Sequence, residues 1–334
     1  MYHGRFRGTH YDIGYKWGSL LKKNNKKILD NIPYALSDDR TGFSHECVPY
    51  YQKYFPEILD EIKGIADGQN VHEERLQTVL FSMYCFMPST HCSCFAVKNE
   101  HGLVLGRNSD FLTSIEKLYM NTIYNFSTAS YSFNGNTTAF VEMEDGINQH
   151  GLAIGLTSVA PEQIQPGLNA GMQLRLFLET CRTIEEMIHL IKTLPSASSH
   201  TFIAADRLGD AALFECSPNE LEIQKIDETG FVCSTNMFNT PKMKPHNNLP
   251  EDNWYARERY QNIWDYLSKN SNTANFLQAQ ELLSGKHGFT CQYDRSTGKD
   301  TVWSTVYNLK DGAIYRVEGN PSRRSFKSDP RKME

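Results

Sequence analysis

The feature that most constrains the fold of this chain is a change of hydrophobic period at Cys92. Before that point, apolar residues recur at helical spacing from Thr9 onward, over 48–66 and over 72–86. After it, the apolar runs become short, and Gly, Asn, Ser or Asp bounds each of them, which is typical of strands. The chain is therefore expected to begin with a helical segment and to continue as a sheet-rich one.

The order of the later elements predicts the class of fold. Strands are expected over 92–98, 103–108, 119–126, 137–143, 152–158, 200–206, 211–216, 220–226, 231–235, 301–308 and 313–318, and helices over 171–181, 184–193, 253–268 and 276–284. Runs of strands separated by helix pairs, without βαβ alternation, indicate an α+β protein with antiparallel sheets and helices packed outside them. No linker divides the chain, so one structural domain is expected.

Local signals place boundaries within the helical segment. Thr9 and Asp12 have the spacing of a capping box, which predicts the start of a helix. Pro56 is expected to break the second helix into two pieces, and Gly68 is expected to end the second piece. Residues 37–47 are polar and rich in turn formers, which predicts a loop.

Composition excludes several classes of partner. The formal net charge is −5 and no basic block stands out, so neither nucleic acid nor an anionic membrane surface is expected to bind. No apolar stretch approaches the length of a transmembrane helix, and Met1–Arg7 lacks the apolar core of a signal peptide. The eight cysteines lie mostly inside apolar runs, as Cys85, Cys216 and Cys233 do, which is typical of reduced thiols. A cytoplasmic protein is expected.

A predicted hairpin over 91–111 collects reactive side chains. The turn 99–102 joins its two strands, so the ends that carry Cys92 and Asp110 are expected to be neighbours. Arg107 lies in the second strand, and a guanidinium beside a cysteine favours the thiolate, which is the nucleophilic form. Taken singly, a thiol in a buried strand is more often a small hydrophobic residue, and an aspartate there can simply begin a turn.

Two other interpretations of the cysteines stay open. Cys94 lies on the same side of the strand as Cys92, and it is interpreted as a packed thiol that could be oxidised together with Cys92. His91, Cys92 and Cys94 could also be metal ligands. Zinc sites, however, use Cys-x₂₋₄-Cys spacing with a second ligand pair, and no such pair is evident in the sequence. Neither a metal nor another cofactor is therefore expected.

The hairpin also carries a family resemblance. Cys92-Ser93 followed by Gly106-Arg107-Asn108-Ser109-Asp110 resembles the nucleophile hairpin of the N-terminal-nucleophile hydrolases that cleave linear amides. Within that superfamily, the chain resembles the penicillin acyltransferase family, with bile-salt hydrolases and penicillin V acylases as more distant kin. Segments along nearly the whole chain share the resemblance: Arg7-Gly8-Thr9, Phe55-Pro56, Gly64-Ile65-Ala66, Gly151 to Thr157, Ser234-Thr235-Asn236 and Gly319-Asn320-Pro321. It implies a four-layer αββα sandwich of two antiparallel sheets.

The resemblance implies a cut that the chain makes in itself between His91 and Cys92. The products are a helical segment 1–91 and a catalytic segment 92–334, packed together as one fold. The freed α-amino group of Cys92 has a reference pKa of about 7.7–8.0 and would serve as the base for its own thiol.

The resemblance also assigns roles to the residues around the nucleophile. Asp110 would orient the new ammonium group, and Arg107 would favour the thiolate. The oxyanion of the tetrahedral intermediate needs donors that are already in place. The Asn236 side chain is one candidate donor, and a backbone N–H near Leu156 or Thr157 is the second.

The expected function is that of a self-processing cysteine amidohydrolase or acyltransferase acting on a small N-acyl amide or acyl thioester. Met83, Phe86 and Met87 precede the cut and either line an acyl pocket or belong to a plain core helix. Gln292 stands where several relatives carry Arg, so a substrate contact there is a weak expectation. The rival functions are a catalytically silent binding protein on the same fold and a metal- or redox-sensing cysteine protein. Substrate identity, the acceptor (water or an amine) and a homo-oligomeric state stay open.

Overall fold

The computed structural model describes residues 1–32, 34–86, 91–138 and 140–333, which form two β-sheets and eight α-helices. Sheet A contains, in spatial order, β1 (Tyr2–Gly8), β4 (Met120–Phe126), β5 (Phe133–Thr137), β6 (Asp145–Asn148), β7 (Ala153–Ser158), β8 (His200–Ala205), β9 (Ala211–Cys216) and β10 (Leu221–Lys225). Sheet B contains β11 (Phe231–Ser234), β2 (His91–Asn99), β3 (Gly102–Leu112), β12 (Lys299–Asn308), β13 (Ala313–Glu318) and β14 (Lys327–Ser328). The helices are α1 (His10–Lys23), α2 (Asp38–Tyr54), α3 (Pro56–Gln69), α4 (Glu73–Ser82), α5 (Ala170–Thr180), α6 (Ile184–Ile191), α7 (Ala256–Asn270) and α8 (Phe276–Leu283).

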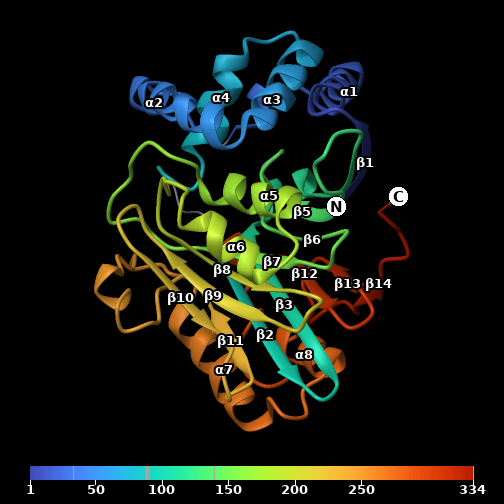
Figure 1. The fold of residues 1–334 in the computed structure, drawn as a ribbon, viewed down its shortest axis with the longest axis vertical. Coiled ribbons are helices and arrows are strands. Elements are labelled where there is room, and N and C mark those ends of the chain that lie inside the picture. The colour runs from blue at the N-terminus through green and yellow to red at the C-terminus, as the bar shows by residue number, and fades with distance from the viewer. Residues whose placement is uncertain (33, 87–90, 139, 334) are drawn as a thin grey trace.

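The two sheets lie face to face and helices cover their outer sides (Figure 1). Helices α5 and α6 lie on sheet A, α7 and α8 lie on sheet B, and α1 to α4 form a further group beyond α5 (Figure 1). Neighbouring strands in both sheets are antiparallel, except that β1 runs parallel to β4 at the edge of sheet A. This arrangement confirms the predicted α+β sandwich of four layers.

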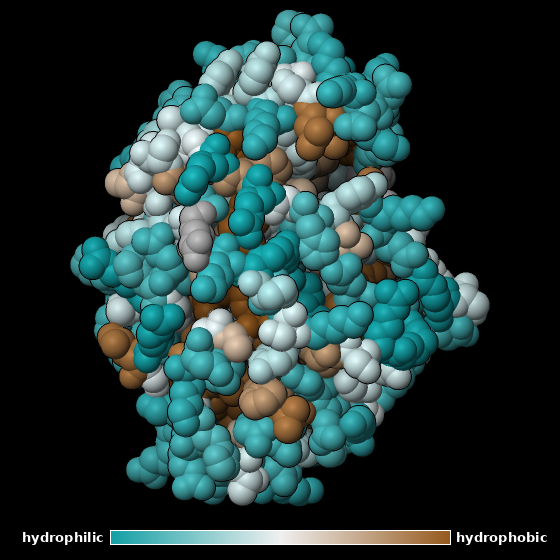
Figure 2. Space-filling model, turned by 90° about the vertical axis from the view of Figure 1, so that its right-hand side faces the viewer, coloured by the Kyte–Doolittle hydropathy of each residue, from teal (hydrophilic) through white to brown (hydrophobic). Residues whose placement is uncertain are grey.

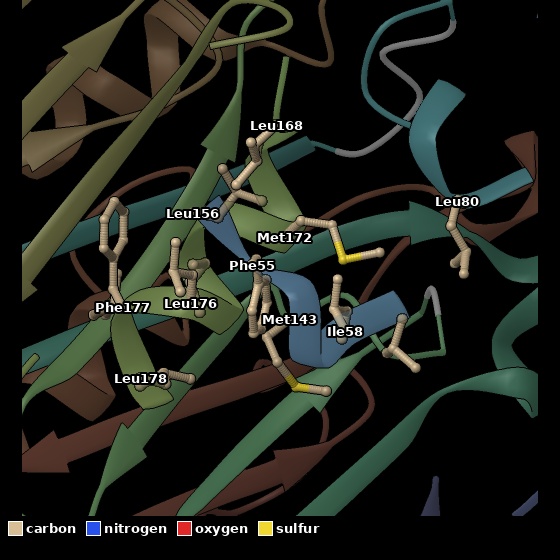
Figure 3. Close-up of a cluster of buried hydrophobic side chains, with 14 of the residues drawn as sticks. Phe55, Ile58, Leu80, Met143, Leu156, Leu168, Met172, Leu176, Phe177 and Leu178 are labelled. Atoms are coloured by element: carbon tan, nitrogen blue, oxygen red, sulfur yellow. The ribbon is translucent and has the colours of Figure 1, made fainter. Parts of the chain in front are cut away.

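The three largest hydrophobic clusters among the described residues hold the layers together. The first joins α1 to α6 with sheet A, and Figure 3 shows Phe55, which precedes α3, with Ile58 of α3, Met172 and Phe177 of α5, and Leu80 of α4. The second lies between the sheets, and the third lies between sheet B and the α7–α8 pair. Residues from both sides of position 91 thus share the first core, although the division into 1–91 and 92–334 stays a prediction.

Several boundary predictions are confirmed. Thr9 and Asp12 form the reciprocal hydrogen bonds of a capping box at the start of α1. Pro56 lies in the first turn of α3, directly after the end of α2, where its missing N–H costs no helical hydrogen bond. The hairpin over 91–111 is formed by β2 and β3.

Other boundary predictions are wrong for identifiable reasons. Residues 38–47 belong to α2, not to a loop, because Ser37 caps the helix and acidic side chains follow in its first turn. Residues 2–8, for which no element is predicted above, form a strand whose Phe6 packs against Trp17 and Tyr124. Helix α3 passes Gly68 and ends at the left-handed Asn70.

The strand predicted over 137–143 is also wrong. Strand β5 ends at Thr137 and β6 begins only at Asp145. The intervening Thr138 hydrogen bonds through its backbone N–H and its hydroxyl to the Glu144 carboxylate, so its backbone is diverted from the sheet. This local turn aims Glu144 at the site described below.

Helices α1 and α3 pack with their backbones in contact. Glycines make this approach possible, because a Cβ at Gly14 would lie 2.1 Å from the Glu61 carbonyl oxygen, and one at Gly64 would lie 2.3 Å from the Tyr11 carbonyl oxygen. Real Cβ atoms do not come so close to a backbone oxygen, so any larger residue must push the helices apart. The α1–α3 pair is therefore a rigid part of the helical segment.

Replacing Gly14 by alanine is expected to lower the free energy of unfolding by about 2–3 kcal/mol, because the helices must separate. Gly42 of α2 is the matched control, since nothing lies within 4 Å of its notional Cβ. Gly42→Ala should stabilise the protein by up to about 1 kcal/mol through helix propensity. Urea unfolding of the two variants measures the contrast, and equal effects would contradict the close approach.

A buried ionic network also links the two parts of the chain. Arg175 of α5 pairs with Glu61 of α3 at 2.6 Å and with Glu179, and His10 of α1 lies 2.8 Å from Glu179. Each of these groups is nearly or fully buried, so removal of one partner would leave an uncompensated charge. The network therefore fixes how residues before position 91 sit on α5.

Within the described residues, no helix has the length and apolarity needed to cross a bilayer. The face in Figure 2 is mostly hydrophilic, with hydrophobic side chains in small separate patches.

Candidate active site

The register of the β2–β3 hairpin places the reactive side chains at one end of sheet B. His91 lies opposite Asp110, and Cys92 lies opposite Ser109. Cys92 and Asp110 are therefore diagonal neighbours, as the hairpin prediction requires. Arg107 lies opposite Cys94, two positions further along the same face.

The Cys92 thiol is buried against a guanidinium. Arg107 Nη2 donates to Cys92 Sγ at 2.8 Å, and the cysteine is 1 % exposed. Sheet A holds the arginine in place: Nη1 donates to Asp145 Oδ2 at 2.8 Å, and Nε donates to the Leu156 carbonyl oxygen at 2.9 Å. Glu144 Oε2 lies 3.3 Å from Nη2. The Arg107 side chain, which comes from sheet B, thus contacts both sheet A and the Cys92 sulfur.

Burial decides the protonation state of this thiol in the intact chain. Burial raises the pKa of Cys92 to about 12, although Arg107 acts to lower it, and Glu144 raises it further. The uncleaved chain therefore holds a neutral thiol at neutral pH. A base within reach must take the proton before the sulfur can attack.

The backbone of Cys92 is held by two side chains from distant elements. Its N–H donates to Asn236 Oδ1 at 2.9 Å, and its carbonyl oxygen accepts from Arg259 Nη1 at 2.5 Å. Arg259 Nη2 also donates to Asn236 Oδ1, at 2.8 Å. The nitrogen that self-cleavage would turn into an amine is thus already positioned.

Asp110 is fully buried and receives three polar neighbours. Tyr293 OH donates to Oδ2 at 2.9 Å, Thr301 Oγ1 donates to Oδ1 at 2.5 Å, and Arg259 Nη1 lies 3.5 Å from Oδ2. Burial raises the pKa of Asp110 to about 6, while Arg259 and the two hydroxyl groups act to lower it. The carboxylate is therefore ionised at neutral pH beside the Cys92 backbone.

Among the predicted oxyanion donors near Cys92, the Asn236 amide and the Leu156 N–H are engaged. Asn236 Nδ2 donates to the Ser158 carbonyl oxygen at 2.9 Å, so the oxygen of this amide, not its nitrogen, meets Cys92. The Leu156 N–H donates to the Glu144 carbonyl oxygen at 2.9 Å. Thr157 Oγ1 donates to the Thr235 carbonyl oxygen at 2.6 Å. Their role as oxyanion donors stays a prediction.

His91 fills the space on the N-terminal side of Cys92. Its ring stacks on Trp254, with 4.5 Å between the centroids and 11° between the planes. Burial, together with Arg259 and Lys299, lowers the pKa of His91 to about 2, so the imidazole is neutral. The His91 ring is therefore a neutral ring stacked on an indole.

The structure also locates the weaker site predictions. Met83 packs against the first core, and Phe86 contacts Phe43 edge to face at 5.3 Å. Met87 lies outside the described residues. The Gln292 amide is engaged with its own loop, since Nε2 donates to the carbonyl oxygens of Gly285 and Gly288. These contacts are with core or loop groups, and a role in a substrate pocket stays a prediction.

Cys94 faces sheet A from the strand that carries Cys92. A Cβ at Gly155 of β7 would lie 2.6 Å from Cys94 Sγ, so the glycine gives the sulfur its space. Burial raises the pKa of the Cys94 thiol, and the side chain is fully buried. Among the described residues, no group of three or more His, Cys, Asp or Glu side chains is arranged to hold a metal ion.

Sequence reasoning missed Arg259, Glu144, Asp145, Tyr293 and Thr301. Arg259 lies in α7, which carries many charged residues, yet it is fully buried. Tyr293 lies outside the helices and strands, directly after Gln292, and its hydroxyl reaches Asp110. No pattern within any of these segments marks them, because each meets Cys92, Arg107 or Asp110 only across sheet or helix contacts.

The comparisons with known proteins agree with this picture. The family model of acyl-coenzyme A:6-aminopenicillanic acid acyl-transferase matches residues 97–323, which is more than half of the chain. The family match thus places the chain in a class of acyltransferases and amide hydrolases. The chain belongs to the acyl-coenzyme A:6-aminopenicillanic acid acyl-transferase family, as the resemblance of its motifs predicted.

Individual relatives are distant. Acyl-coenzyme A:6-aminopenicillanic-acid-acyltransferase of Emericella nidulans is 26% identical over 280 residues, which cover 79% of this chain and 77% of the relative. Beta-alanyl-dopamine/carcinine hydrolase of Drosophila melanogaster is 24% identical over 195 residues, which cover 48% of this chain and 49% of the relative. Among solved structures, penicillin V acylase from Agrobacterium tumefaciens has a TM-score of 0.48 at 16% identity, covering 68% of this chain and 82% of that one. A mutant conjugated bile acid hydrolase from Clostridium perfringens has a TM-score of 0.46 at 15% identity, covering 72% and 97%.

Proposed function

We propose that this protein cuts itself between His91 and Cys92 and then uses Cys92 as the nucleophile of an amide hydrolase or acyltransferase. The observation that carries the proposal is that side chains hydrogen bond to both the sulfur and the backbone nitrogen of Cys92. Arg107 Nη2 contacts its sulfur at 2.8 Å, and Asn236 Oδ1 accepts from its nitrogen at 2.9 Å. A structural cysteine needs neither contact, whereas an N-terminal nucleophile needs both its thiol and its amine to be positioned.

The self-cleavage breaks an amide C–N bond, which is the same kind of bond that the enzyme later breaks in its substrate. Cys92 Sγ attacks the His91 carbonyl carbon, and the C–N bond breaks, so the acyl group moves from nitrogen to sulfur. The thiol proton is passed to the released amine. Water then hydrolyses the thioester and leaves a carboxylate on His91 and a free Cys92. Segments 1–91 and 92–334 remain together through their shared core and the Arg175 network.

The mature site contains a base that the intact chain lacks. The α-amino group of Cys92 has a reference pKa of about 7.7–8.0, close to the operating pH of a general base. It takes the thiol proton, the thiolate attacks the substrate carbonyl, and the leaving amine departs with a proton. Arg107 favours the thiolate, which offsets part of the cost of burial.

Asp110 and Asn236 are proposed to hold the new ammonium group. Asp110 is an ionised, buried carboxylate one register position from Cys92, and Asn236 Oδ1 already accepts from the Cys92 nitrogen. For the Asn236 amide to donate to an oxyanion as well, its Nδ2 must release the Ser158 carbonyl oxygen. A backbone N–H of Thr157 is the second proposed donor.

The substrate class follows from the chemistry of this nucleophile. A thioester intermediate forms from an N-acyl amide or from another acyl thioester, and either water or an amine can resolve it. The relatives are named for transfer to 6-aminopenicillanic acid and for hydrolysis of beta-alanyl amides, so both outcomes lie within reach. No metal or organic cofactor takes part in the proposed reaction.

The test is the state of the purified protein. Intact mass and N-terminal sequencing should show two chains, and the larger one should begin at Cys92. An iodoacetamide-type reagent should label that residue in the mature protein. A fully intact chain whose Cys92 resists the reagent would overturn the proposal and favour a silent binding protein.

The stability of the uncleaved chain should report the Asp110 carboxylate. Because the folded pKa of about 6 exceeds the ordinary value of 3.8, the folded state holds the proton more tightly than the unfolded state. This contribution is fully present below pH 3.8 and is lost as the pH rises through 6. As the pH rises from about 3 to about 7, the free energy of unfolding of Cys92→Ala should fall by about 3 kcal/mol relative to that of Cys92→Ala/Asp110→Asn. Urea unfolding across this range measures it, and parallel pH profiles would contradict a buried, ionisable Asp110.

A further inference from the structure

A connected cluster of four aromatic side chains lies against His91, beside the bond that would be cut. Its members are Trp254, Tyr255, Phe289 and Tyr293. The His91 ring stacks on Trp254, which meets Tyr293 edge to face at 5.6 Å. Phe289 contacts Tyr293 at 5.4 Å and Tyr255 at 5.1 Å. Tyr255 is 55% exposed, whereas Tyr293 hydrogen bonds to Asp110, so the cluster reaches from the surface to the candidate nucleophile site.

The backbone that presents Trp254 is held in a costly conformation. Trp254 and Tyr255 have φ of 52° and 60°, in the left-handed region that bulky residues seldom adopt. Such residues cost about 1–3 kcal/mol each and persist only where their surroundings over-determine them. Here the Trp254 carbonyl oxygen accepts from Arg259 Nε at 2.9 Å and from Tyr293 OH at 3.3 Å. The residues that hold Cys92 and Asp110 therefore also hold the indole.

The His91 ring is a poor chemical match for the place it fills. Its Nδ1 is buried and has no hydrogen-bond partner among the described residues, and the residue is only 7% exposed. A buried acceptor without a donor costs free energy, whereas a carbocyclic ring of similar size would not carry that cost. Trp254 is therefore a platform for a flat ring, and its preferred occupant is less polar than imidazole.

Self-cleavage relates this occupant to the substrate. When the His91 carbonyl moves to Cys92 Sγ, the thioester carries a ring joined to its carbonyl carbon through two carbons, Cα and Cβ. A substrate that acylates the same sulfur forms a thioester at the same place, once the cut has freed the His91 end of segment 1–91 to withdraw from Trp254. The His91 acyl group is therefore a template for the acyl group of the substrate.

We propose that Trp254 binds the ring of the substrate's acyl group, and that the preferred substrates are amides of 3-arylpropanoic acids. This inference rests on the proposed function, since it needs Cys92 as the nucleophile. In the first step, the Cys92 thiol and the amide give a thioester and a free amine. In the second step, water and the thioester give the 3-arylpropanoate and the free thiol.

The test compares N-acyl glycines on the mature protein, so that the leaving amine is constant and has no ring. The probes are 3-phenylpropanoyl-, phenylacetyl-, hexanoyl- and acetyl-glycine, with release of glycine as the readout. The kcat/KM value should be highest for the 3-phenylpropanoyl compound, by about 5- to 10-fold over hexanoyl-glycine. Hydrolysis of the series without preference for the ring, or with preference for phenylacetyl, would overturn the inference while leaving the nucleophile intact. Hydrolysis of none of the probes, with Cys92 unlabelled, would overturn both.

Variants of Trp254 test the platform itself. In Trp254→Leu, the ratio of kcat/KM for 3-phenylpropanoyl-glycine to that for hexanoyl-glycine should fall by about 5- to 10-fold, and Trp254→Phe should restore most of it. Trp264→Leu is the matched control, because Trp264 lies on α7 at 38% exposure and should leave the ratio unchanged. A ratio that is equal in all four proteins would contradict the assignment.

Binding of the product gives a measurement that does not depend on turnover. Isothermal titration with 3-phenylpropanoate should show binding to the mature wild-type protein. The uncleaved Cys92→Ala chain should bind it at least about 10-fold more weakly, because His91 still covers Trp254. Equal affinity for both forms would show that the ring binds elsewhere and would overturn the inference.

Discussion

Cys92→Ala is expected to be a single uncleaved chain of 38.2 kDa with at least about 10⁴-fold lower amide hydrolase activity than the mature wild type. The physical reason is that one sulfur performs both reactions, so its removal abolishes the cut and the acyl-enzyme together. Denaturing mass spectrometry measures the cut, and glycine release from an N-acyl glycine measures the turnover.

Cys94→Ala is the matched control for this prediction. Both thiols are buried on β2 and both lie near Arg107, but only Cys92 Sγ accepts a hydrogen bond from its guanidinium. Cys94→Ala should therefore still be cut at position 91, with a stability loss of about 1 kcal/mol from the small cavity. The assignment of Cys92 as the nucleophile would be contradicted if the Cys92→Ala chain were still cut, or if the Cys94→Ala chain were not.

Arg259→Ala is expected to lower the free energy of unfolding by about 3–5 kcal/mol and to prevent self-cleavage. The guanidinium is fully buried and lies 3.5 Å from Asp110, so its loss leaves that carboxylate without its nearest cation. The Cys92 carbonyl oxygen loses its donor at the same time. Arg259→Lys should recover only part of the stability, because an ammonium group cannot reach all the oxygen atoms that accept hydrogen bonds from the planar guanidinium.

The stability measurement is best made in the Cys92→Ala background, where wild-type and variant are both single chains and unfolding can be compared directly. Arg295→Ala is the control, since Arg295 forms two ion pairs but is about half exposed. Its replacement should cost no more than about 1 kcal/mol. Equal losses for the two arginines would mean that Arg259 contributes nothing beyond an ordinary surface ion pair.

The candidate site was predictable to the extent that it is local in the chain. Cys92, Arg107 and Asp110 lie within one hairpin, and strand periodicity with a polar turn is enough to bring them together. The residues that support them are not local. Arg259 reaches the Cys92 carbonyl oxygen across 167 positions, and Thr301 reaches Asp110 across 191. A pattern read along the sequence carries no information about such pairs.

The errors in the fold have the same origin. Residues 38–47 look like a loop by composition, but a cap at Ser37 and packing on α4 make them helical. Residues 137–143 look like a strand by propensity, but hydrogen bonds from Thr138 to Glu144 end β5 early. In both cases, a side-chain contact outweighed a local preference of a few tenths of a kcal/mol per residue.

The sequence by itself determined the change from helices to strands at Cys92, the α+β class, the hairpin and the family to which the chain belongs. It could do so because hydrophobic period and short motifs are properties of neighbouring residues. Only the tertiary structure decided that the Cys92 thiol is buried with a pKa of about 12, that Arg259 holds its backbone, and that Trp254 stacks on His91. Burial and electrostatic contacts depend on which strands and helices pack against one another, and the packing of the two sheets determines those contacts.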